Sequence, residues 1–437
     1  MFLEEGEKML ESCVLPKCVT DITDCPIEAN HFQEYKKHLE YLLPTLFDLI
    51  SSREIELFDC VPETLRFRKL FVEFVCEQTS DCATFQTEVA LLRRNLLNFE
   101  RRLKKMLKDD GNLGREMIVL YKSKLLGEAW KRNLGAIYGF IHFCKVSFRD
   151  NQDNPLDLDK AMFILSIGSQ FLENHDPAFK LCGLKLFRLI LESLQKDKLM
   201  ETNTHEVIYS QAIANVDKLN SEECTQEIWK CVWLSMSIDK KVPRNLQWNK
   251  FDDCLQTLIY KLKLESNLGT RRFLQDTLIR FVLFTIPDKE KIEVNWNAWA
   301  SNNQESLNAL KRKRGTFDNA KCYRWAKSLL DMIVFQFLTI ASSRQDAIPT
   351  IQFVHTTYLI TLSFIKRDLL DEFLTQFVKR SLPICAEILN IFRDADSRVQ
   401  EELIDFLTTV NYQTSERQDE NNYFKALSDF LAHVTKP

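Results

Sequence analysis

The chain has 437 residues, enough to bury a large apolar core in one elongated domain or in two or three ordinary ones. It contains only 10 glycines and 11 prolines, a composition that favours helices over β-turns and glycine-rich ligand loops. Lys plus Arg total 58 against 62 Asp plus Glu, a formal charge of −4. This balance argues against nucleic acid as the main partner, because phosphate backbones are bound by a strong positive field.

The cysteines and the apolar runs indicate the compartment. The 13 cysteines are scattered and include no CxxC pair, which is typical of reduced thiols in the cytosol or nucleus. Residues 1–10 are acidic where a secretory signal carries basic residues, so we expect no signal peptide. The longest apolar run, 332–341, contains Gln336 and is shorter than the roughly 18 to 20 residues of a membrane span. We expect a protein without membrane helices, located in the cytoplasm and nucleus.

The first segment contains three cysteines and a histidine that could be read as a metal site. Cys13, Cys18, Cys25 and His31 are separated by four, six and five residues. Zinc sites favour ligand pairs two to four residues apart, so this spacing fits poorly. We predict no metal site here, and a mobile N-terminal segment with ordinary thiols.

Apolar residues at helical spacing predict a series of helices separated by short polar breaks. The expected helices lie near 31–51, 62–76, 85–108, 116–148, 159–173, 177–194, 205–216, 222–238, 246–264, 268–285, 319–341, 347–366, 369–392, 397–410 and 421–434. Helix pairs joined by short loops and recurring about every forty residues are typical of degenerate helical repeats. The predicted fold class is therefore all-α, an α-solenoid of stacked antiparallel helix pairs of the HEAT or armadillo type.

The helix near 85–108 has the clearest amphipathic pattern. Its apolar face is formed by Phe85, Val89, Leu92, Leu96, Phe99, Leu103 and Met106. The opposite face carries Arg93, Arg94, Arg101, Arg102, Lys104 and Lys105. This basic face is either a solvated helix side or a docking surface for an acidic partner.

Two polar interruptions organise the rest of the chain. Residues 149–159, RDNQDNPLDLD, end one long helix, and 287–317 mix tryptophans, asparagines and the run KRKR at 311–314. We predict an N-terminal helical region at 1–150 and HEAT-like repeats at 151–437, continuous with the first region, with an irregular insertion near 287–317. The KRKR run is either a nuclear-import signal or a solvated loop.

The common catalytic motifs are absent from the sequence. There is no GxxxxGK[ST], GxGxxG, HExxH or GxSxG. His142 lies on an apolar helix face and is interpreted as a packed residue instead of a catalytic base. We predict a non-enzymatic protein with no cofactor, although an all-α enzyme with dispersed catalytic residues remains an alternative.

The stretch FLENHDPAFKLCGLKLFRLIL, residues 171–191, places Glu173, His175 and Asp176 within four positions. Asp176 followed by Pro177 is typical of a helix N-terminus, where the carboxylate accepts hydrogen bonds from open backbone N–H groups. Gly183 leaves room for a neighbouring backbone to approach. The stretch therefore predicts a tight corner between two antiparallel helices, and not a catalytic acid–histidine–acid site.

The same corner resembles the signature of the second Tel-Two-interacting protein family, a HEAT-like subunit of the Triple T co-chaperone complex. The matching residues are Glu173, Asn174, His175, Asp176, Lys180, Gly183 and Leu184, with Pro177 in the same corner. The resemblance continues at Val207, Ile208, Tyr209, Ala212, Leu255, Ile259, Arg271 and Arg272. It covers about 159–287 and is weaker over 319–392.

The resemblance implies a scaffold without catalytic activity. Family members bind the first Tel-Two-interacting protein and, through it, Tel-Two. With the heat-shock chaperone machinery, the trimer supports the maturation and stability of phosphatidylinositol-3-kinase-related kinases such as mTOR and ATM. The alternative is an importin-like or other helical-repeat transport or cargo adaptor, which would bind Ran in a nucleotide-sensitive way.

Partner surfaces are expected where apolar residues exceed what one helix stripe can bury. The richest such segment is in the C-terminal half. It contains Ile351, Phe353, Tyr358, Ile360 and Phe364.

Overall fold

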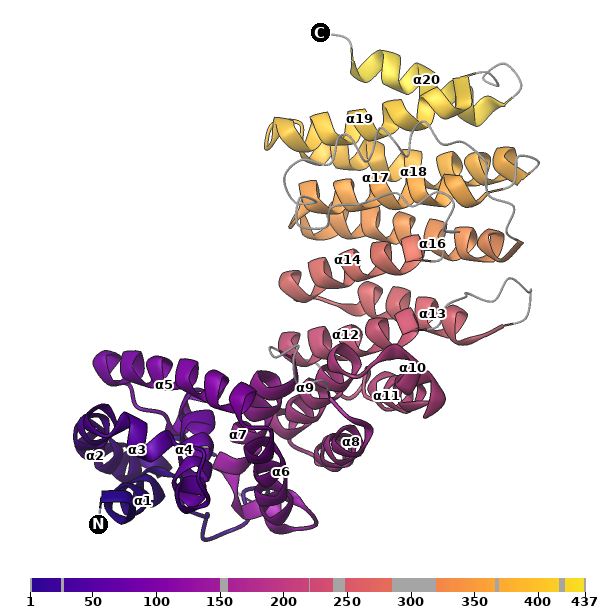
Figure 1. Cartoon of the computed structure of the whole chain (residues 1–437). Helices are drawn as coiled ribbons and strands as arrows, with labels where there is room; N and C mark the ends of the chain where they lie inside the picture. The colour runs from indigo at the N-terminus through magenta and orange to yellow at the C-terminus, as the bar shows by residue number, and fades with distance from the viewer. Residues whose placement is uncertain are drawn as a thin grey trace. The chain divides into compact units, whose positions relative to one another are not determined.

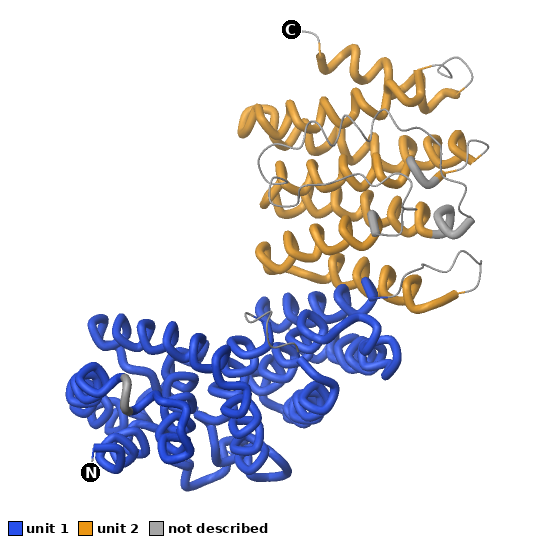
Figure 2. The backbone as a smooth tube through the Cα atoms, viewed as in Figure 1, with its two compact units in different colours: residues 1–239 blue, residues 240–437 orange. Residues whose placement is uncertain are grey.

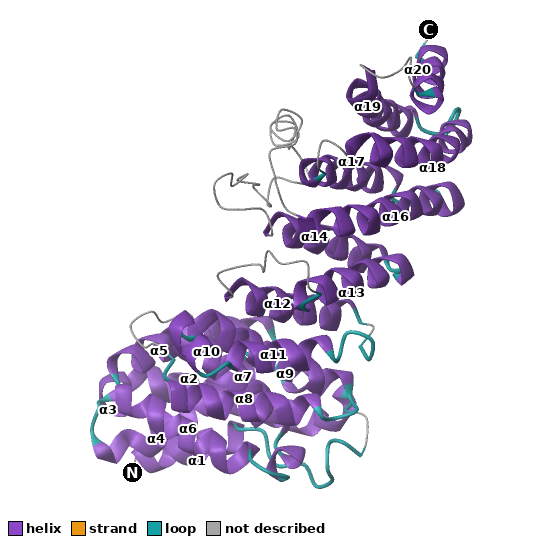
Figure 3. Ribbon diagram, turned by 90° about the vertical axis from the view of Figure 1, so that its right-hand side faces the viewer, coloured by secondary structure: helices purple, strands orange, loops and turns teal. Residues whose placement is uncertain are grey.

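The computed structural model describes residues 2–24, 27–149, 156–219, 221–238, 248–284, 320–365, 369–415 and 421–435 (Figure 1). Every regular element in these ranges is a helix, so the all-α prediction is confirmed (Figure 3). The helices form two compact units, Met1–Asp239 (unit 1) and Lys240–Pro437 (unit 2) (Figure 2).

Unit 1 is built from helices that pack against their neighbours along the chain. Its α-helices are α1 (Phe2–Cys13), α2 (Gln33–Ser52), α3 (Glu54–Phe58), α4 (Leu65–Gln78), α5 (Ala90–Asp109), α6 (Gly111–Leu125), α7 (Leu134–Cys144), α8 (Leu158–Leu172), α9 (Pro177–Ser193), α10 (Lys196–Glu201), α11 (Thr204–Ile213) and α12 (Glu222–Ile238). Short helical turns are η1 (Ala29–Phe32), η2 (Pro62–Thr64), η3 (Ala83–Phe85), η4 (Ala129–Arg132) and η5 (Lys145–Arg149). The helices α1, α4, α7, α9 and α12 contact one another in succession and form the centre of the unit.

Unit 2 shows the same neighbour-to-neighbour packing with a clear alternation. Its helices are α13 (Lys250–Leu264), α14 (Leu268–Phe284), α16 (Ala320–Ser343), α17 (Ala347–Phe364), α18 (Leu370–Ile391), α19 (Ser397–Thr414) and α20 (Asn422–Val434). One row of successive contacts runs through α13, α16, α18 and α20, and a second runs through α14, α17 and α19. Alternate helices therefore lie in two layers, which Figure 3 shows from α13 to α20.

Polar side chains determine where several helices begin. A carboxylate or amide oxygen at the N-cap accepts backbone N–H groups of the first turn, which have no partner inside the helix. These caps are Asp110 for α6, Asp157 for α8, Asp176 for α9, Asn249 for α13, Asp396 for α19 and Asn421 for α20. The apolar faces then supply the packing that stabilises each helix.

The prediction of one long helix over 116–148 is wrong. The structure has α6, the turn η4 and α7 in its place, because the chain reverses between Leu126 and Asn133. Gly127 adopts a left-handed φ of 61°, a conformation that costs glycine little. Trp130 is buried against Phe171 and Phe179, with ring centroids 5.3 and 5.2 Å apart, and this packing holds the turn in place.

The prediction of a mobile N-terminal segment is also wrong. Helix α1 packs against α2 and α4, with Leu10 and Cys13 fully buried. The chain that follows is held by backbone hydrogen bonds from Cys18 N–H to the Arg132 carbonyl, 2.8 Å, and from Ile22 N–H to the Lys131 carbonyl, 2.7 Å. These long-range contacts leave no periodic signal in the sequence.

The apolar segment in the C-terminal half does not form an exposed patch. Ile351, Phe353, Tyr358 and Ile360 are at most 3 % exposed, and Phe364 lies outside the described side chains. The expectation of a partner surface there is wrong because α14, α16 and α19 surround α17 and bury it on several sides.

One helix among the described residues is long and apolar enough to cross a membrane, judged by length and composition alone. It is the 19-residue segment Trp325–Ser343 of α16, which contains the apolar run 332–341. This segment packs against α13, α17 and α18, and it buries Gln336 with its apolar neighbours. Half of this segment is buried inside unit 2.

The division into compact units falls at residues 239 and 240, whereas the sequence placed a boundary at 150. Helices before and after that point share one core, since α7 and η5 both contact α9. Arg149 also pairs with Glu192 of α9 at 3.0 Å. The predicted insertion near 287–317, with KRKR at 311–314, lies outside the described residues, as does most of the polar stretch after Arg149.

Candidate functional site

The predicted corner lies between α8 and α9. Helix α8 ends at Leu172, and Asn174 Oδ1 then accepts the backbone N–H of Asp176 at 2.8 Å. Asp176 Oδ1 accepts the N–H of Ala178 at 2.8 Å, and Pro177 is the first residue of α9. The helix therefore begins with the cap and the proline that the sequence predicts.

The two helices touch through a pair of glycines. A Cβ placed on Gly183 would lie 2.5 Å from the carbonyl oxygen of Gly168, and 3.1 Å from Leu172. A Cβ on Gly168 would lie 2.7 Å from the ring of Phe187. Real Cβ atoms do not approach this closely, so both positions need glycine for the helices to pack at this separation.

The acid–histidine–acid pattern does not assemble into a chemical site. Glu173 and His175 are exposed at the surface of the corner. The Asp176 carboxylate is instead engaged in capping α9. General acid–base chemistry needs these groups within hydrogen-bond reach of one another and of a substrate, which this arrangement does not provide.

Removing the cap should lower stability by a modest amount. We expect Asp176→Ala to reduce the free energy of unfolding by about 1 kcal/mol, the usual cost of losing an N-cap acceptor. Asp176→Asn should stay close to the wild type because its amide oxygen can accept the Ala178 N–H. Urea denaturation followed by circular dichroism measures both. Equal losses in the two variants would show that the charge, and not the cap, is what matters.

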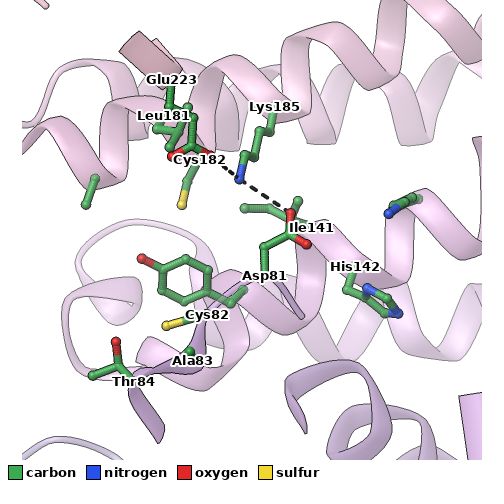
Figure 4. A pocket seen from close by; sticks show the side chains of 13 residues that line it. Asp81, Cys82, Ala83, Thr84, Ile141, His142, Leu181, Cys182, Lys185 and Glu223 are labelled. Carbon is green, nitrogen blue, oxygen red and sulfur yellow. Dashed lines mark hydrogen bonds and ion pairs between the residues drawn. The ribbon is translucent and has the colours of Figure 1, made fainter. Parts of the chain in front are cut away.

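A pocket of about 280 Å³ opens in unit 1 on another side of α9 (Figure 4). It is formed by η3 and the two residues before it, and by α7, η5, α9 and α12. Its lining residues are Asp81, Cys82, Ala83, Thr84, Tyr138, Ile141, His142, Lys145, Ala178, Leu181, Cys182, Lys185 and Glu223. None of these was predicted as a site residue, although His142 was considered and interpreted as a packed side chain.

One cluster of paired charges lies in the pocket, among mostly uncharged side chains. Lys185 Nζ lies 3.4 Å from Asp81 Oδ2 and 3.2 Å from Glu223 Oε1, so one lysine joins three elements (Figure 4). Burial lowers the pKa of Lys185, but the two carboxylates outweigh burial and raise the pKa above its usual value. Burial raises the pKa of the Cys182 thiol to about 12. Both groups are therefore protonated near neutral pH, and neither is an activated nucleophile.

His142 lies at the edge of this pocket and is almost fully buried. Its Nε2 is 3.1 Å from Thr79 Oγ1 and 3.5 Å from Glu100 Oε1. The hydrogen bond with His142 holds the pKa of Glu100 at about 2, against the opposing effect of burial. The histidine links α4, α5 and α7 as a packed side chain, in agreement with its interpretation from the sequence.

Among the described residues, Cys13, Cys18 and His31 do not form a metal-binding group. Cys13 is buried, Cys18 is half-buried, His31 is exposed, and Cys25 lies outside the described residues. Burial raises the pKa of Cys13 to about 12, which disfavours the thiolate that a metal would need. Across the described part of the chain, no group of three or more His, Cys, Asp or Glu side chains is placed to hold a metal ion.

No family model matches this chain, and no curated protein matches it.

The residues that sequence reasoning missed are joined over long distances in the chain. Asp81 and Lys185 are 104 positions apart, and no local spacing connects them. The only sequence signal at Lys185 is a cation within the apolar run that forms α9, and such a cation is common on half-buried helices. The pocket could therefore not be found before α7, α9 and α12 were placed together.

Proposed function

We propose that this chain is a non-enzymatic scaffold subunit of the Triple T complex. In this role it binds the first Tel-Two-interacting protein, reaches Tel-Two through it, and supports chaperone-dependent maturation and stability of phosphatidylinositol-3-kinase-related kinases in the cytoplasm and nucleus. It acts by binding and uses no cofactor. The observation that carries the proposal is the α8–α9 corner, because the residues of the family resemblance meet there.

Five residues of that corner have a structural role, whereas Glu173 and His175 are exposed. Asp176 and Pro177 start α9, and Gly183 sets the distance to α8. Leu184 is fully buried, and its carbonyl accepts the thiol of Cys231 in α12 at 3.4 Å. Lys180 Nζ donates to Asn215 Oδ1 after α11 at 3.4 Å. The corner thus joins one helix pair to the next, which is what a repeat signature does in a solenoid.

The arrangement of the helices as repeats is part of the same proposal. We propose an α-solenoid of stacked antiparallel helix pairs of the HEAT or armadillo type. Its support is the pair of contact rows in unit 2 and the succession α1, α4, α7, α9 and α12 in unit 1. Such stacking buries each helix pair against its neighbours and leaves long surfaces for partners.

Several downstream residues of the resemblance have structural roles of the same kind, whereas Val207 is exposed. Ile208 and Ala212 are fully buried in α11, and Leu255 is buried in α13. Arg272 of α14 forms a two-pronged ion pair with Asp346, which precedes α17, with Nε 2.8 Å from Oδ2. These positions stabilise helix pairs, so the partner surface of a scaffold lies elsewhere, on faces that the helices leave exposed.

Copurification tests the proposal directly. The tagged full chain, expressed at its natural level, should copurify with the first Tel-Two-interacting protein, Tel-Two and at least one large kinase of the family. Depletion of the chain should lower the steady-state level of those kinases. A preparation that contains neither sister subunit nor any such kinase would overturn the proposal. Release of cargo by Ran in its triphosphate form would instead favour the transport adaptor.

A further inference from the structure

Helix α5 presents an outward face that its neighbours leave uncovered. It packs against α2, α4, α6 and η5, and Figure 1 shows it along the edge of unit 1. Its inward side is formed by Leu92, Leu96, Phe99, Leu103, Met106 and Leu107, all buried. Helical spacing puts Arg94, Leu97, Arg101 and Lys105 on the side opposite the core, and all four are exposed. We refer to these four residues as the α5 ridge.

The ridge concentrates positive charge on a chain whose net charge is negative. Among the described residues, Arg94 and Lys105 form no ion pair, and the Arg101 guanidinium donates only to the neutral amide of Asn98, at 3.3 Å. By contrast, Arg102 on the flank of the same helix pairs with Glu54 and lies over the Phe58 ring. The outward-facing cations of the ridge are therefore not neutralised by carboxylates of the described residues, whereas Arg102, which faces neighbouring elements, is paired.

Helix stability does not account for this charge pattern. Cations favour the C-terminal end of a helix and anions the N-terminal end, because of the helix dipole. Lys108 in the last turn follows that rule, but the first turn of α5 has no acidic residue and no side-chain cap. Arg93 and Arg94 follow directly, near the end where cations are unfavourable. An anionic group from outside the chain would supply what this end of the helix lacks.

Exposed leucines lie among the cations. Leu97, in the middle of the ridge, is 54 % exposed, and Leu91 near its start is 66 % exposed. Sugar–phosphate backbones are held by charged and polar groups and do not need such side chains. An apolar contact surrounded by cations fits an amphipathic protein helix with leucines on its contact face and carboxylates beside them.

We propose that the α5 ridge is a docking surface for an acidic, leucine-bearing helix of a partner protein. Arg94 and Arg101 are seven residues apart, about 10.5 Å along the axis. That distance equals one heptad of a second helix, so acidic side chains at heptad spacing meet Arg94 and Arg101 in register, and Lys105 adds a third cation about 6 Å beyond Arg101. Leu97 lies between them and takes the apolar contact. The α5 ridge can serve as this surface whichever complex the chain joins.

A binding assay with a defined probe tests the ridge. The probe is a fluorescein-labelled, stapled helical peptide of about 18 residues with leucine at heptad positions a and d and glutamate at e and g. Companion probes are the same peptide with lysine in place of glutamate and a labelled poly-uridine of equal charge. Fluorescence anisotropy with the intact chain should show saturable binding of the glutamate peptide. Its affinity should fall roughly tenfold between about 50 and about 300 mM salt, because the contacts are exposed ion pairs.

Matched variants locate the binding site. The triple variant Arg94→Glu, Arg101→Glu and Lys105→Glu should weaken binding at least roughly tenfold. Leu97→Ser should weaken it by about threefold or more, which a purely electrostatic surface would not show. The control variant Lys17→Glu, Lys37→Glu and Lys196→Glu changes the net charge equally at exposed positions on other parts of unit 1, and it should bind like the wild type. Circular dichroism should show the same helix content for all variants, since every substituted side chain is exposed.

Three results would overturn the proposal. The first is equal binding of the glutamate peptide to the wild type and to the triple ridge variant. The second is tighter binding of poly-uridine that Leu97→Ser leaves unchanged, which would assign the ridge to phosphate backbones. The third is the absence of saturable binding of the glutamate peptide up to about 1 mM.

Discussion

Gly183→Leu is expected to unfold unit 1 or leave it loosely packed, with a loss of more than about 3 kcal/mol in the free energy of unfolding. The first atom of the new side chain would lie 2.5 Å from the Gly168 carbonyl oxygen, which is backbone and cannot rotate away. The α8 and α9 helices would have to separate, and Phe187 would lose its place over Gly168. Thermal and urea unfolding monitored by circular dichroism measure the loss.

Two further glycine substitutions separate steric overlap from general effects of replacing glycine in a helix. Gly183→Ala places only the Cβ and should cost less than leucine while remaining destabilising. A Cβ on Gly114, in the interior of α6, meets no atom within 4 Å. Gly114→Ala should therefore be neutral or stabilising by up to about 1 kcal/mol, because alanine is the better helix former. A Gly183→Leu protein as stable as the wild type would contradict the account of the corner.

Capping residues and apolar periodicity predicted the helices well wherever one face of a helix packs against the core. The α8–α9 corner could be predicted in detail because its cap, its proline and its glycine act within a few residues of one another. Helix α5 was clear from Leu92 to Met106 because its apolar residues repeat every three or four positions and are buried as a stripe. Its predicted start at Phe85 is wrong, because Phe85 belongs to η3, and Val89 is an exposed N-cap. In both cases the physical cause lies inside a single turn or a single helix.

The errors come from contacts between distant segments. The turn at Gly127 is stabilised by Trp130 packing against Phe171 and Phe179, residues that are far along the chain. The apolar residues of α17 were assigned to a surface because a sequence does not show how many neighbours surround a helix. The pocket around Lys185 has the same origin, since its two carboxylates come from different elements. Periodicity describes one helix face, whereas these features depend on which helices meet.

The attachment of the N-terminal segment to α4 is also a contact between distant segments, and we expect its loss to have a large effect on stability. Glu77 of α4 is 1 % exposed, and its Oε2 accepts the backbone N–H of Leu15 at 2.8 Å across 62 positions of sequence. Burial, with the neighbouring carboxylate of Glu73, raises the pKa of Glu77 well above its usual value. The hydrogen bond from Leu15 and the charge of Lys124 oppose that rise without cancelling it. Glu77 therefore stabilises the fold most in its protonated form.

We expect Glu77→Ala to lower the free energy of unfolding by about 2 to 4 kcal/mol, because it leaves the Leu15 N–H buried without its acceptor and opens a cavity beside α7. Glu77→Gln retains an oxygen for that N–H and should remain close to the wild type at pH 5. A carboxyl group whose pKa is raised by folding contributes its full stability below the unfolded pKa of about 4.3, and loses it as pH rises through the folded pKa. The glutamine variant should therefore gain stability relative to the wild type between about pH 5 and pH 8. Urea denaturation across this range measures the difference in the free energy of unfolding. If the wild type instead becomes more stable relative to the glutamine variant as pH rises, Glu77 is held as a carboxylate paired with a cation.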